Sequence, residues 1–584
     1  MLLIRQSCTK LLRYNPSNSS KFIRAISTSI STSTLLNNDT TKPQSFKPLI
    51  NIRNMSGEAS SGYSKTVWNE TDDLLAKPPQ YPQLTQDAKT DVVVVGGGIA
   101  GLHIAYELLS TGMKKVILLE DGKIGSGETG RTTGHLSADN EYNDFLNLHG
   151  AEGTAEIAAA QQSAIERIAS IVQKHNIDCD FVRIPGYMFN GLPTSDKNFR
   201  LDTLEELYDA AEKTGKLDVS IVNDAYIKGF KSGPAVKFNN QATFHPTKYI
   251  QALAKIISDM GGEIYEKTRY MNYKEENGGV TAELDNDKKI QCQSLVMATN
   301  VPLQKLVMIE RVEAFRTYAI ALKIKTSSVS SNGEDALWWD LGDPYHYIRV
   351  TPHKQEGYSL LVVGGEDEKV GQHDDYEERY QRLEKWTRER WTSAEDLEYK
   401  WSGQVLDSQD GIAYIGRNPG TENIYVHTGD NGDGLTYAAV GGMLITDLIL
   451  GKENKWAHTF SPSRQHSGSH LKQALKTFPD LIKENLSDQI YYTKWVTSCT
   501  KTMTDIEDLV PGEGDVVRQG LSPIAVYKDE HGDVHKMTAI CPHLKGIVAW
   551  NSAEKSFDCP IHGSRFTCKG EVVNGPAKGP LQPK

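Results

Sequence analysis

The sequence predicts an α/β protein with a Rossmann-like nucleotide-binding sheet, an interleaved α+β domain and a small all-β domain at its C-terminal end. The apolar run 91–95 leads into a G-x-G-x-x-G spacing made by Gly96, Gly98 and Gly101, and a helical pattern follows. That order is strand, tight turn and helix. Helical and strand-like patterns then alternate through the middle of the chain, and 504–584 contains short strands and many glycines.

Length and composition restrict the possible functions. The chain has 584 residues, enough for two or three domains. Its 64 basic and 75 acidic residues give a net charge of -11, so we expect no nucleic-acid partner. No run approaches the roughly 20 apolar residues of a membrane span, so we expect no transmembrane segment. The seven cysteines are few and are not spaced as a secreted disulfide framework, which favours a reducing compartment.

The N-terminal segment 1–54 has the composition of a mitochondrial transit peptide. It is basic, has a Ser/Thr-rich tract at 27–34 and contains no acidic residue before Asp39. We expect a matrix location, although composition leaves open a disordered tail. Initiation at Met55 would remove the segment and leave a cytoplasmic product. Residues 55–89 are polar and rich in proline, and they predict an extended lead-in.

The glycine fingerprint predicts a nucleotide site. Gly96 permits the turn, Gly98 permits close approach of a pyrophosphate, and Gly101 permits close packing of helix and strand. The N–H groups at the helix start, from Ile99 and Ala100 onward, and the positive end of the helix dipole would face the phosphates. A second apolar strand at 115–119 ends at Glu120, where such folds place the acid that binds the ribose. The alternative for Glu120 is a solvated acid at a strand end, and its neighbour Asp121 is a bystander.

The loop 125–134 is rich in glycine and hydroxyl groups, and no regular element is expected in it. With the fingerprint before it, the chain resembles the D-amino-acid oxidase family of FAD enzymes, also called the glycine and D-amino-acid oxidase-like group, over about 91–455. The resemblance implies that this loop covers the FAD, and a plain surface loop is the alternative. The implied FAD-binding residues of the loop are Thr129, Gly130, Arg131, Thr132 and Thr133.

The resemblance places a flavin domain at 90–460 with a substrate domain inserted at about 150–240 and 310–405. Within the segment 242–250, His245 is a weak candidate for a catalytic base, because a histidine before proline is more often a structural turn residue. The expected elements are helices at 151–174, 200–215, 246–260 and 374–390 and strands at 181–183, 186–189, 262–265, 294–300, 337–341, 345–350 and 359–363.

Four aromatic residues of the later strands, Trp338, Trp339, Tyr345 and Tyr347, admit two interpretations. Their ring faces could line a pocket for a cationic amine. Ordinary packing in a core is at least as good an explanation.

The segment 427–436 and the small-residue helix after it resemble the closing segment of the family. There the helix N-terminus would face the pyrimidine end of the flavin and stabilise negative charge. The residues that this implies are Gly432, Gly434, Leu435 and Thr436. No second G-x-G-x-x-G opens a strand–helix unit downstream, which weighs against reductases that bind NAD(P)H beside FAD. A linker with one amphipathic helix (471–486) is expected at 461–503.

The C-terminal segment carries two Cys/His pairs, Cys541-x-His543 and Cys559-x-x-His562. Such a set could bind zinc. The proline after each cysteine and the sequence 563–566 (GSRF) resemble the Rieske [2Fe-2S] domain over about 504–580. The resemblance implies that the two cysteines bind one iron and the two histidines the other.

Two departures from the high-potential Rieske proteins of respiratory complexes predict a low reduction potential. Gly546 and Ile561 stand where those proteins have an extra cysteine pair, and Phe566 stands where they have a tyrosine near a ligand sulfur. Fewer hydrogen bonds to the sulfurs make a cluster harder to reduce. Cys568 is expected to be a bystander.

The two centres together predict a dehydrogenase that oxidises a C–N bond of an amine or amino acid. FAD accepts two electrons and the cluster carries one, so the pair can deliver electrons one at a time to an unknown acceptor. The alternatives are electron flow from a partner through the cluster to the flavin, or a non-enzymatic redox sensor. We expect noncovalent FAD, because Arg131 stands where relatives with a covalent link place a histidine, and His135 follows four residues later.

Overall fold

The computed structural model describes residues 62–68, 79–138, 141–192, 201–303, 306–464 and 506–584. The predicted transit peptide, Met55 and the predicted linker helix at 471–486 lie outside these residues. The structure below is that of the unit Ser56–Lys584.

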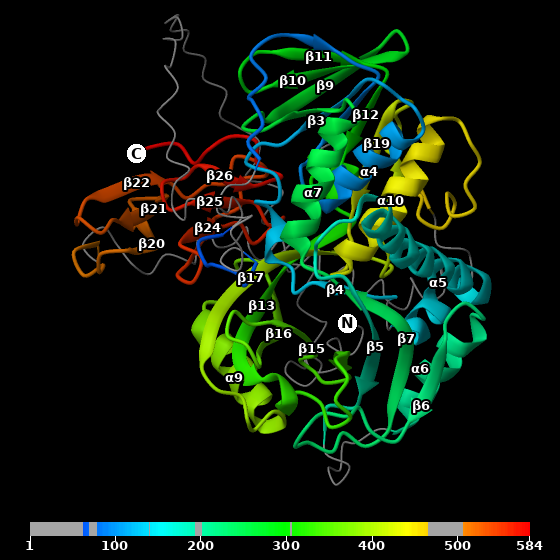
Figure 1. The fold of residues 1–584 in the computed structure, drawn as a ribbon. Helices are drawn as coiled ribbons and strands as arrows, with labels where there is room; N and C mark the ends of the chain where they lie inside the picture. The colour runs from blue at the N-terminus through cyan, green and yellow to red at the C-terminus, as the bar shows by residue number, and fades with distance from the viewer. Residues whose placement is uncertain (1–61, 69–78, 139–140, 193–200, 304–305, 465–505) are drawn as a thin grey trace, which may run out of the picture. The chain divides into compact units, whose positions relative to one another are not determined.

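A six-stranded sheet forms the centre of the flavin domain (Figure 1). Five of its strands are parallel, and β18 is antiparallel to its neighbour. The predicted Val-rich strand is β2, and all four of its residues are buried because both faces of the sheet are covered. In spatial order the strands are β18 (Tyr414–Arg417), β19 (Ile424–Thr428), β12 (Ser294–Met297), β2 (Val92–Val95), β3 (Val116–Leu119) and β8 (Glu263–Tyr265).

Helices cover one face of this sheet and a second sheet covers the other. The helices α4 (Ile99–Ser110), α7 (Pro246–Asp259) and α10 (Gly434–Ile449) lie side by side in Figure 1 and share one apolar core with the sheet. The opposite face packs on a separate core beneath a four-stranded sheet. Its strands are β1 (Ala88–Lys89), β11 (Lys289–Cys292), β10 (Gly279–Leu284) and β9 (Tyr270–Glu276).

The expected substrate domain is built on a nine-stranded sheet. Helix α9 (Tyr376–Arg390), expected at 374–390, packs against β13 and β16. The strands are, in spatial order, β17 (Leu397–Ser408), β13 (Val312–Lys325), β16 (Tyr358–Lys369), β15 (His346–Pro352), β14 (Leu337–Asp340), β5 (Val182–Phe189), β7 (Ala235–Thr243) and β4 (His135–Leu136), and β6 (Val219–Val222) pairs with β7.

The helix predicted at 151–174 is confirmed as the second part of α5 (Tyr142–His175), which a kink at Gly150, where φ is 69°, separates from a short first part that was not expected. Two local expectations need correction. The two strands predicted at 181–189 are one strand, β5, whose register shifts between Ile184 and Gly186. The loop 125–134 is not wholly irregular, because it contains the 3-10 turn η3 (Glu128–Arg131). The remaining short helices are α6 (Leu201–Lys213), α8 (Leu306–Ile309) and η4 (Thr326–Ser328).

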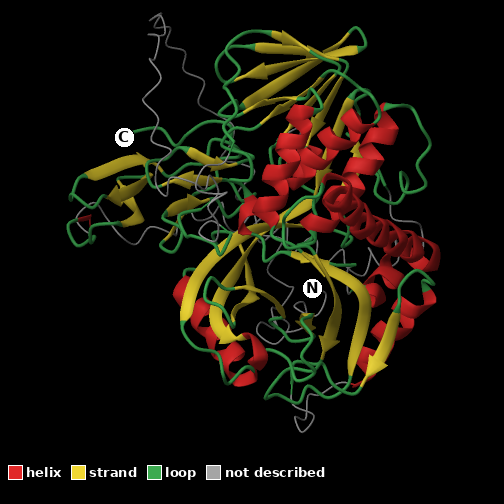
Figure 2. Cartoon of the chain, viewed as in Figure 1, coloured by secondary structure: helices red, strands yellow, loops and turns green. Residues whose placement is uncertain are grey.

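The C-terminal domain is all-β, as predicted (Figure 2). Both of its sheets are antiparallel. The three-stranded sheet is β20 (Glu513–Gln519), β21 (Ser522–Lys528) and β22 (Val534–Thr538), and the four-stranded sheet is β23 (Ala549–Asn551), β24 (Ser556–Asp558), β25 (Arg565–Thr567) and β26 (Val572–Asn574).

The described part of the lead-in is more than a connection. Val67 and Trp68 are buried in a core with residues of β13 and β17, including Trp401. The lead-in therefore packs against strands of the nine-stranded sheet, which the flavin loop (125–134) also contacts at Trp401.

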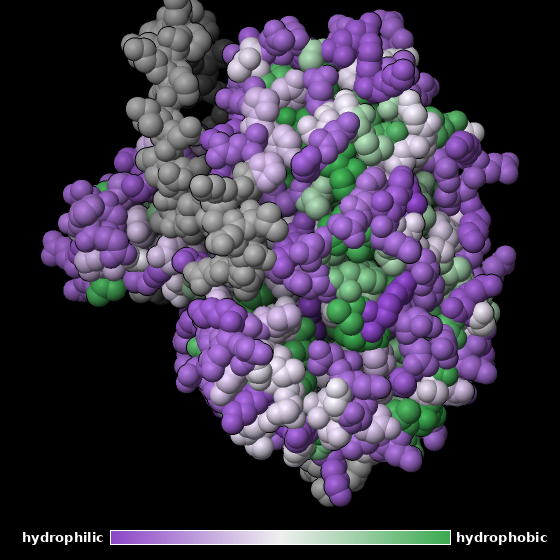
Figure 3. Space-filling model, viewed as in Figure 1, coloured by the Kyte–Doolittle hydropathy of each residue, from purple (hydrophilic) through white to green (hydrophobic). Residues whose placement is uncertain are grey.

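The face of the molecule in Figure 3 is mainly hydrophilic, and apolar side chains show between the hydrophilic ones, chiefly near the middle of the view. Among the helices that the structure describes, none combines the length and apolar character needed to cross a membrane.

Candidate functional site

The three glycines of the fingerprint occupy different environments. A Cβ on Gly96, whose φ is +114°, would lie 2.1 Å from the Ala298 carbonyl oxygen, and a Cβ on Gly101 would lie 1.9 Å from the Gly96 carbonyl oxygen. At these two positions a side chain would clash with backbone carbonyl oxygens of the protein itself. A Cβ on Gly98 would meet only the Thr129 hydroxyl, at 3.2 Å. Packing of the turn therefore does not require a glycine at position 98. The space beside Gly98 would instead allow the close approach of a pyrophosphate.

Glu120 ends β3 beside the fingerprint. Its carboxylate accepts hydrogen bonds from the backbone N–H groups of Gly97 (2.8 Å) and Gly122 (2.6 Å). Burial, and then the neighbouring Asp121, raise the pKa of Glu120 to about 8. Asp121 pairs with Arg269 at 3.0 Å, and its side chain also hydrogen-bonds to Glu120. The structure thus holds the predicted ribose-binding acid against the glycine turn, with Asp121 in contact with it.

The predicted flavin loop lies over the N-terminus of α4. The Thr129 hydroxyl accepts a hydrogen bond from the Ile99 N–H at 3.1 Å. From its other side the loop is held by the lead-in, since the Thr66 hydroxyl donates to the Gly130 carbonyl (3.0 Å) and the Trp68 indole donates to the Thr132 carbonyl (2.6 Å). The loop is therefore held by hydrogen bonds on both sides, through the Thr129 hydroxyl toward α4 and through its backbone carbonyls toward the lead-in.

Arg131 belongs to this loop, but its guanidinium turns away from α4. The side chain is buried and binds the C-terminal domain through Glu554, with a shortest distance of 2.6 Å. Only its main chain stays with the loop.

The closing segment 427–436 leads directly into α10. Asp433 is the N-cap, Gly432 has a φ of +91°, and the helix starts at Gly434. Leu435 is buried, and the Thr436 hydroxyl donates to the Ser137 carbonyl at 2.7 Å. The start of α10 is thereby tied to the segment that follows the flavin loop.

His135 connects the flavin loop to the substrate domain. Its Nδ1 lies 3.1 Å from the Thr133 hydroxyl and its Nε2 lies 3.1 Å from the Ile348 carbonyl oxygen. The ring contacts Trp339 and Tyr347, with centroid distances of 5.7 and 5.6 Å. Burial, and then the charge of Arg349, lower the pKa of His135 to about 3. The imidazole is neutral at physiological pH, and both nitrogens have partners.

The four aromatic residues separate into two groups. Trp338 is fully buried in the core, where its indole donates to the Ala225 carbonyl and its ring packs on Trp391. Trp339 on β14 and Tyr347 on β15 form a wall beside the flavin loop, since both rings contact His135. Tyr345 contacts Tyr347 with a centroid distance of 5.9 Å. Core packing accounts for Trp338, and Trp339 also belongs to a core, with Tyr347 packed against it; the pocket for a cationic amine stays a prediction.

Sequence reasoning did not find the charged residues of this wall. The Tyr345 hydroxyl donates to Asp367 at 2.7 Å, and the Tyr347 hydroxyl pairs with Thr317. Burial raises the pKa of both Asp367 and Asp407, and the charge of Asp367 raises that of Asp407 further. No sequence signal marks these acids, because their neighbours come from other strands.

Arg349 is a second residue that the sequence did not reveal. Its guanidinium is buried, donates to the carbonyls of Gly134 (2.6 Å) and Phe244 (3.0 Å), and lies over the Trp68 ring. Burial lowers its pKa to about 9. It ties the flavin loop to the start of α7.

His245 has a structural position. It is the N-cap of α7, where its Nδ1 accepts from the Lys248 N–H at 3.3 Å, and its ring packs edge-on against Trp68. A capping histidine stabilises the helix start, and this supports the turn interpretation.

The four predicted metal ligands lie on two loops at one end of the C-terminal domain. The Cys541 and Cys559 thiols form a hydrogen bond, which lowers the pKa of Cys541 and raises that of Cys559. The His543 and His562 rings are 5.1 Å apart and partly exposed. Among the described residues no three such side chains form the ligand group of a single ion. Two buried thiols with two adjacent imidazoles are the donor set of a Rieske cluster.

The positions that departed from high-potential Rieske proteins are neighbours in space. A Cβ on Gly546 would lie 2.6 Å from the Ile561 side chain and 3.1 Å from the Cys559 sulfur. The Ser564 hydroxyl hydrogen-bonds to the Cys541 sulfur. Cys568 is buried beside Tyr527, with its pKa raised to about 12 chiefly by burial.

Comparisons with known proteins identify both parts of the chain. The profile of the family "FAD dependent oxidoreductase" (DAO) matches residues 91–448, which is more than half of the chain. The chain belongs to the FAD dependent oxidoreductase family. The profile of the Rieske [2Fe-2S] domain matches residues 500–583 of this oxidoreductase.

Relatives of the oxidoreductase agree with both assignments. A protein of Bacillus subtilis (strain 168), YhfW, whose name describes a Rieske 2Fe-2S iron-sulfur protein, is 30% identical over 89% of the chain and 97% of its own length. Glycine oxidase of Bacillus licheniformis is 26% identical over 65% of the chain and 98% of its own length. The crystal structure of glycine oxidase from Geobacillus kaustophilus covers 65% of the chain and 99% of its own length, with 17% identity and a TM-score of 0.52, and confirms the fold.

The residues present fit FAD and a [2Fe-2S] cluster. The open Gly98 and the Glu120 carboxylate would hold a dinucleotide at the start of α4, where the Ile99 N–H is bound to the Thr129 hydroxyl, and the four Cys and His ligands suit the cluster. When bound, FAD supplies a two-electron acceptor and the cluster supplies a one-electron carrier.

Proposed function

We propose that the oxidoreductase removes two electrons from a C–N bond of an amine or amino acid and passes them one at a time through the Rieske domain to a separate acceptor. The observation that carries the proposal is the contact between the cluster loop and the wall of the flavin enzyme. The Gln404 side chain on β17 donates to the Gly563 carbonyl at 3.3 Å, and a Cβ on Gly563 would lie 2.4 Å from Ala314 on β13. Gly563 immediately follows the ligand His562.

Two acids of the wall beside the flavin loop, Asp367 and Asp407, support an amine as the substrate. Asp367 and Asp407 are carboxylates removed from solvent beside Tyr345, and a cation between them would favour their ionised forms. Two relatives agree in class, since one is named gamma-glutamylputrescine oxidoreductase and one glycine oxidase. For an amine substrate the wall would bind and orient the cationic group through these acids and the tyrosine rings.

Anaerobic titration of the holoprotein with small amines and amino acids tests the proposal. We expect flavin bleaching followed by the paramagnetic signal of the reduced cluster. Reduction of the cluster only by an external reduced protein would instead support electron flow from a partner through the cluster to the flavin. No turnover with any donor class would support the redox sensor.

We propose that the FAD is held noncovalently, because both His135 nitrogens have hydrogen-bond partners and Arg131 binds Glu554. Acid precipitation is expected to release yellow cofactor into the supernatant. Flavin that stays with the pellet would refute this part.

We propose a mitochondrial matrix location for the full-length product and a cytoplasmic one for a product that starts at Met55. The basic, acid-free composition before Asp39 supports the first. Fractionation of cells that express each form tests both, and a cytoplasmic full-length product would contradict the matrix proposal.

A further inference from the structure

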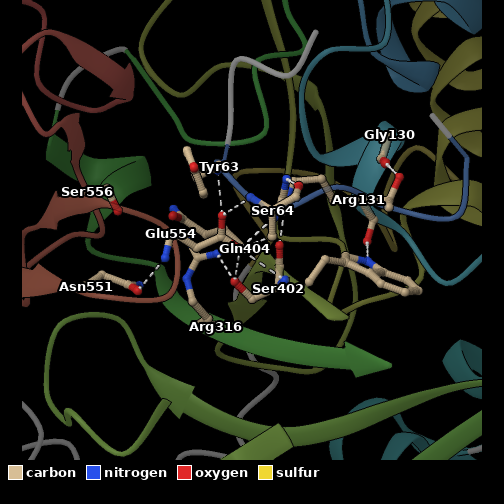
Figure 4. A network of polar contacts seen from close by, with 12 residues as sticks. Tyr63, Ser64, Gly130, Arg131, Arg316, Ser402, Gln404, Asn551, Glu554 and Ser556 are labelled. Carbon is tan, nitrogen blue, oxygen red and sulfur yellow. Dashed lines mark hydrogen bonds and ion pairs between the residues drawn. The ribbon is translucent and has the colours of Figure 1, made fainter. Parts of the chain in front are cut away.

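Glu554 lies in the Rieske domain between β23 and β24, yet its carboxylate serves another part of the chain. It is 2% exposed. One oxygen accepts from Arg131 Nη2 (2.6 Å), from the Ser64 hydroxyl (2.6 Å) and from the N–H (3.2 Å) and hydroxyl (2.6 Å) of Ser402. The other oxygen accepts from the N–H groups of Tyr63 (2.7 Å) and Ser64 (3.1 Å). Figure 4 shows these donors converging on the carboxylate from the lead-in, the flavin loop and β17.

Arg131 forms the ion pair with Glu554, and the charges of Arg316 and Arg565 also act on this carboxylate. The Arg131 side chain donates hydrogen bonds from all three of its guanidinium nitrogens. Nε donates to the Ser402 carbonyl (2.5 Å), Nη1 to the Ser64 carbonyl (3.0 Å), and Nη2 to the Ser64 hydroxyl (2.5 Å) and to Glu554. Its own carbonyl accepts from the Trp401 indole at 2.8 Å. The main chain of Arg131 thus belongs to the flavin loop, and its guanidinium binds the Rieske domain.

The ion pair is closed off from water. A Cβ on Gly62 would lie 2.5 Å from both the Arg131 guanidinium carbon and a Glu554 oxygen, so the lead-in passes directly over the pair. A buried ion pair whose remaining donors are all satisfied holds its geometry, because removing one partner leaves a charge without compensation.

The other end of η3 makes a second bridge. One Glu128 oxygen accepts from the backbone N–H of Gln404 (2.8 Å), and the other accepts from Asn574 of the Rieske domain (3.3 Å). Gln404 also binds the cluster loop at Gly563. Both ends of one short turn in the flavin loop therefore contact the domain that carries the cluster.

We propose that Glu554 is a positioning residue of the flavin site, which holds the Rieske domain docked on η3 and thereby keeps the flavin loop in its FAD-binding shape. Docking and FAD binding then strengthen each other, since coupling between two sites is reciprocal. The inference deepens the proposed function, because the same contact fixes the path along which an electron passes from flavin to cluster.

The test uses full-length protein that contains both cofactors. In Glu554→Gln the side-chain amide would face the Tyr63 and Ser64 N–H donors and would remove the charge opposite Arg131. We expect the FAD dissociation constant to rise about tenfold. We also expect the electron transfer that follows photoreduction of the flavin to slow by about the same factor. The iron and sulfide contents should stay at the parent level.

The matched control is Glu530→Gln, because Glu530 is an exposed acid of the same domain. It should leave the FAD affinity and the transfer rate at the parent values. Arg131→Gln should act like Glu554→Gln, and the double variant should cost no more than the worse single one, as expected for one shared interaction.

An unchanged FAD affinity or an unchanged transfer rate in Glu554→Gln overturns the proposal. If that variant does not fold, Ser64→Ala removes one hydroxyl shared by both partners and should give smaller changes in the same direction. No change in Ser64→Ala would equally overturn it. Photoreduction requires no amine, so a failure of amines to reduce the flavin would refute the proposed function and leave this test intact.

Discussion

At the residue scale, two glycines of the fingerprint have different roles, because Gly101 is needed for folding and Gly98 for cofactor binding. Gly101→Ala places a methyl group 1.9 Å from the Gly96 carbonyl oxygen, whereas Gly98→Ala meets only the Thr129 hydroxyl at 3.2 Å. We expect Gly101→Ala to destabilise the flavin domain by several kcal/mol, roughly 3 or more, through overpacking. We expect Gly98→Ala to fold and to lose FAD affinity. Thermal unfolding of the FAD-free protein and FAD titration check the two outcomes.

This prediction has an internal control. Gly112 stands in the turn after α4 with open space around its Cβ position, although its φ of +93° adds strain. Gly112→Ala should therefore lower stability modestly and leave FAD affinity unchanged. A Gly98→Ala variant that unfolds as readily as Gly101→Ala would show that Gly98 is also a packing position.

A second prediction at this scale concerns the cluster potential. The Ser564 hydroxyl hydrogen-bonds to the Cys541 sulfur, and hydrogen bonds to ligand sulfurs raise the potential. Ser564→Ala should lower the midpoint by about 40 mV, which corresponds to about 1 kcal/mol for one electron. The parent should lie in the lower part of the range from about -150 to +300 mV. Redox titration followed by paramagnetic resonance measures both.

Thr567→Val is the matched control for the potential, because the Thr567 hydroxyl serves only the backbone of Lys569 and Glu571 in the contacts described. It should leave the midpoint unchanged. A parent potential near the top of the range would contradict the low-potential interpretation of Phe566 and Gly546.

Residue identity alone predicted the ligands and the glycines but not the buried charges. Cys541, His543, Cys559 and His562 stand in fixed local spacings, so the sequence contains the signal. Glu554 and Arg131 are 423 positions apart, and neither has a neighbour in sequence that marks it as buried. Such pairs follow from the packing of domains, which periodicity does not encode.

At the element scale, α4 and α7 are joined by a buried histidine that makes the flavin domain sensitive to acid. His103 Nε2 lies 3.0 Å from the Tyr249 hydroxyl, and burial, followed by the charges of Arg167 and His427, lowers the His103 pKa to about 3. The unfolded chain binds this proton near pH 6.5, and the folded chain does not. The contribution of His103 to stability is therefore full above about pH 6.5 and falls by about 1.4 kcal/mol per pH unit as the pH drops toward 3.

Unfolding midpoints measured from pH 7.5 to 5 check this dependence. His103→Gln should flatten the slope, whereas Tyr249→Phe should lower stability at every pH and keep the slope, because the buried imidazole remains. A His103→Gln variant with the slope of the parent would contradict the assignment.

Elements were predictable where one pattern ran unbroken. Helices α7 and α9 and the buried strand β2 lie within one or two residues of expectation. The misses have local causes, since Pro185 interrupts the pattern of β5 at its register shift and Gly150 separates the two parts of α5. The turn η3 has no periodic signal because it is only one turn long.

At the scale of the whole molecule, two redox centres on one chain predict a defined electron capacity. The holoprotein should take up about three electrons, two at FAD and one at the cluster. Cys541→Ser removes a cluster ligand and should reduce the uptake to about two, with the flavin spectrum retained. Anaerobic titration with dithionite, followed by absorbance and paramagnetic resonance, counts them. An uptake of two electrons by protein with full iron and sulfide content would mean that the cluster stays outside the redox range of the flavin, and electrons could not then pass singly from one centre to the other.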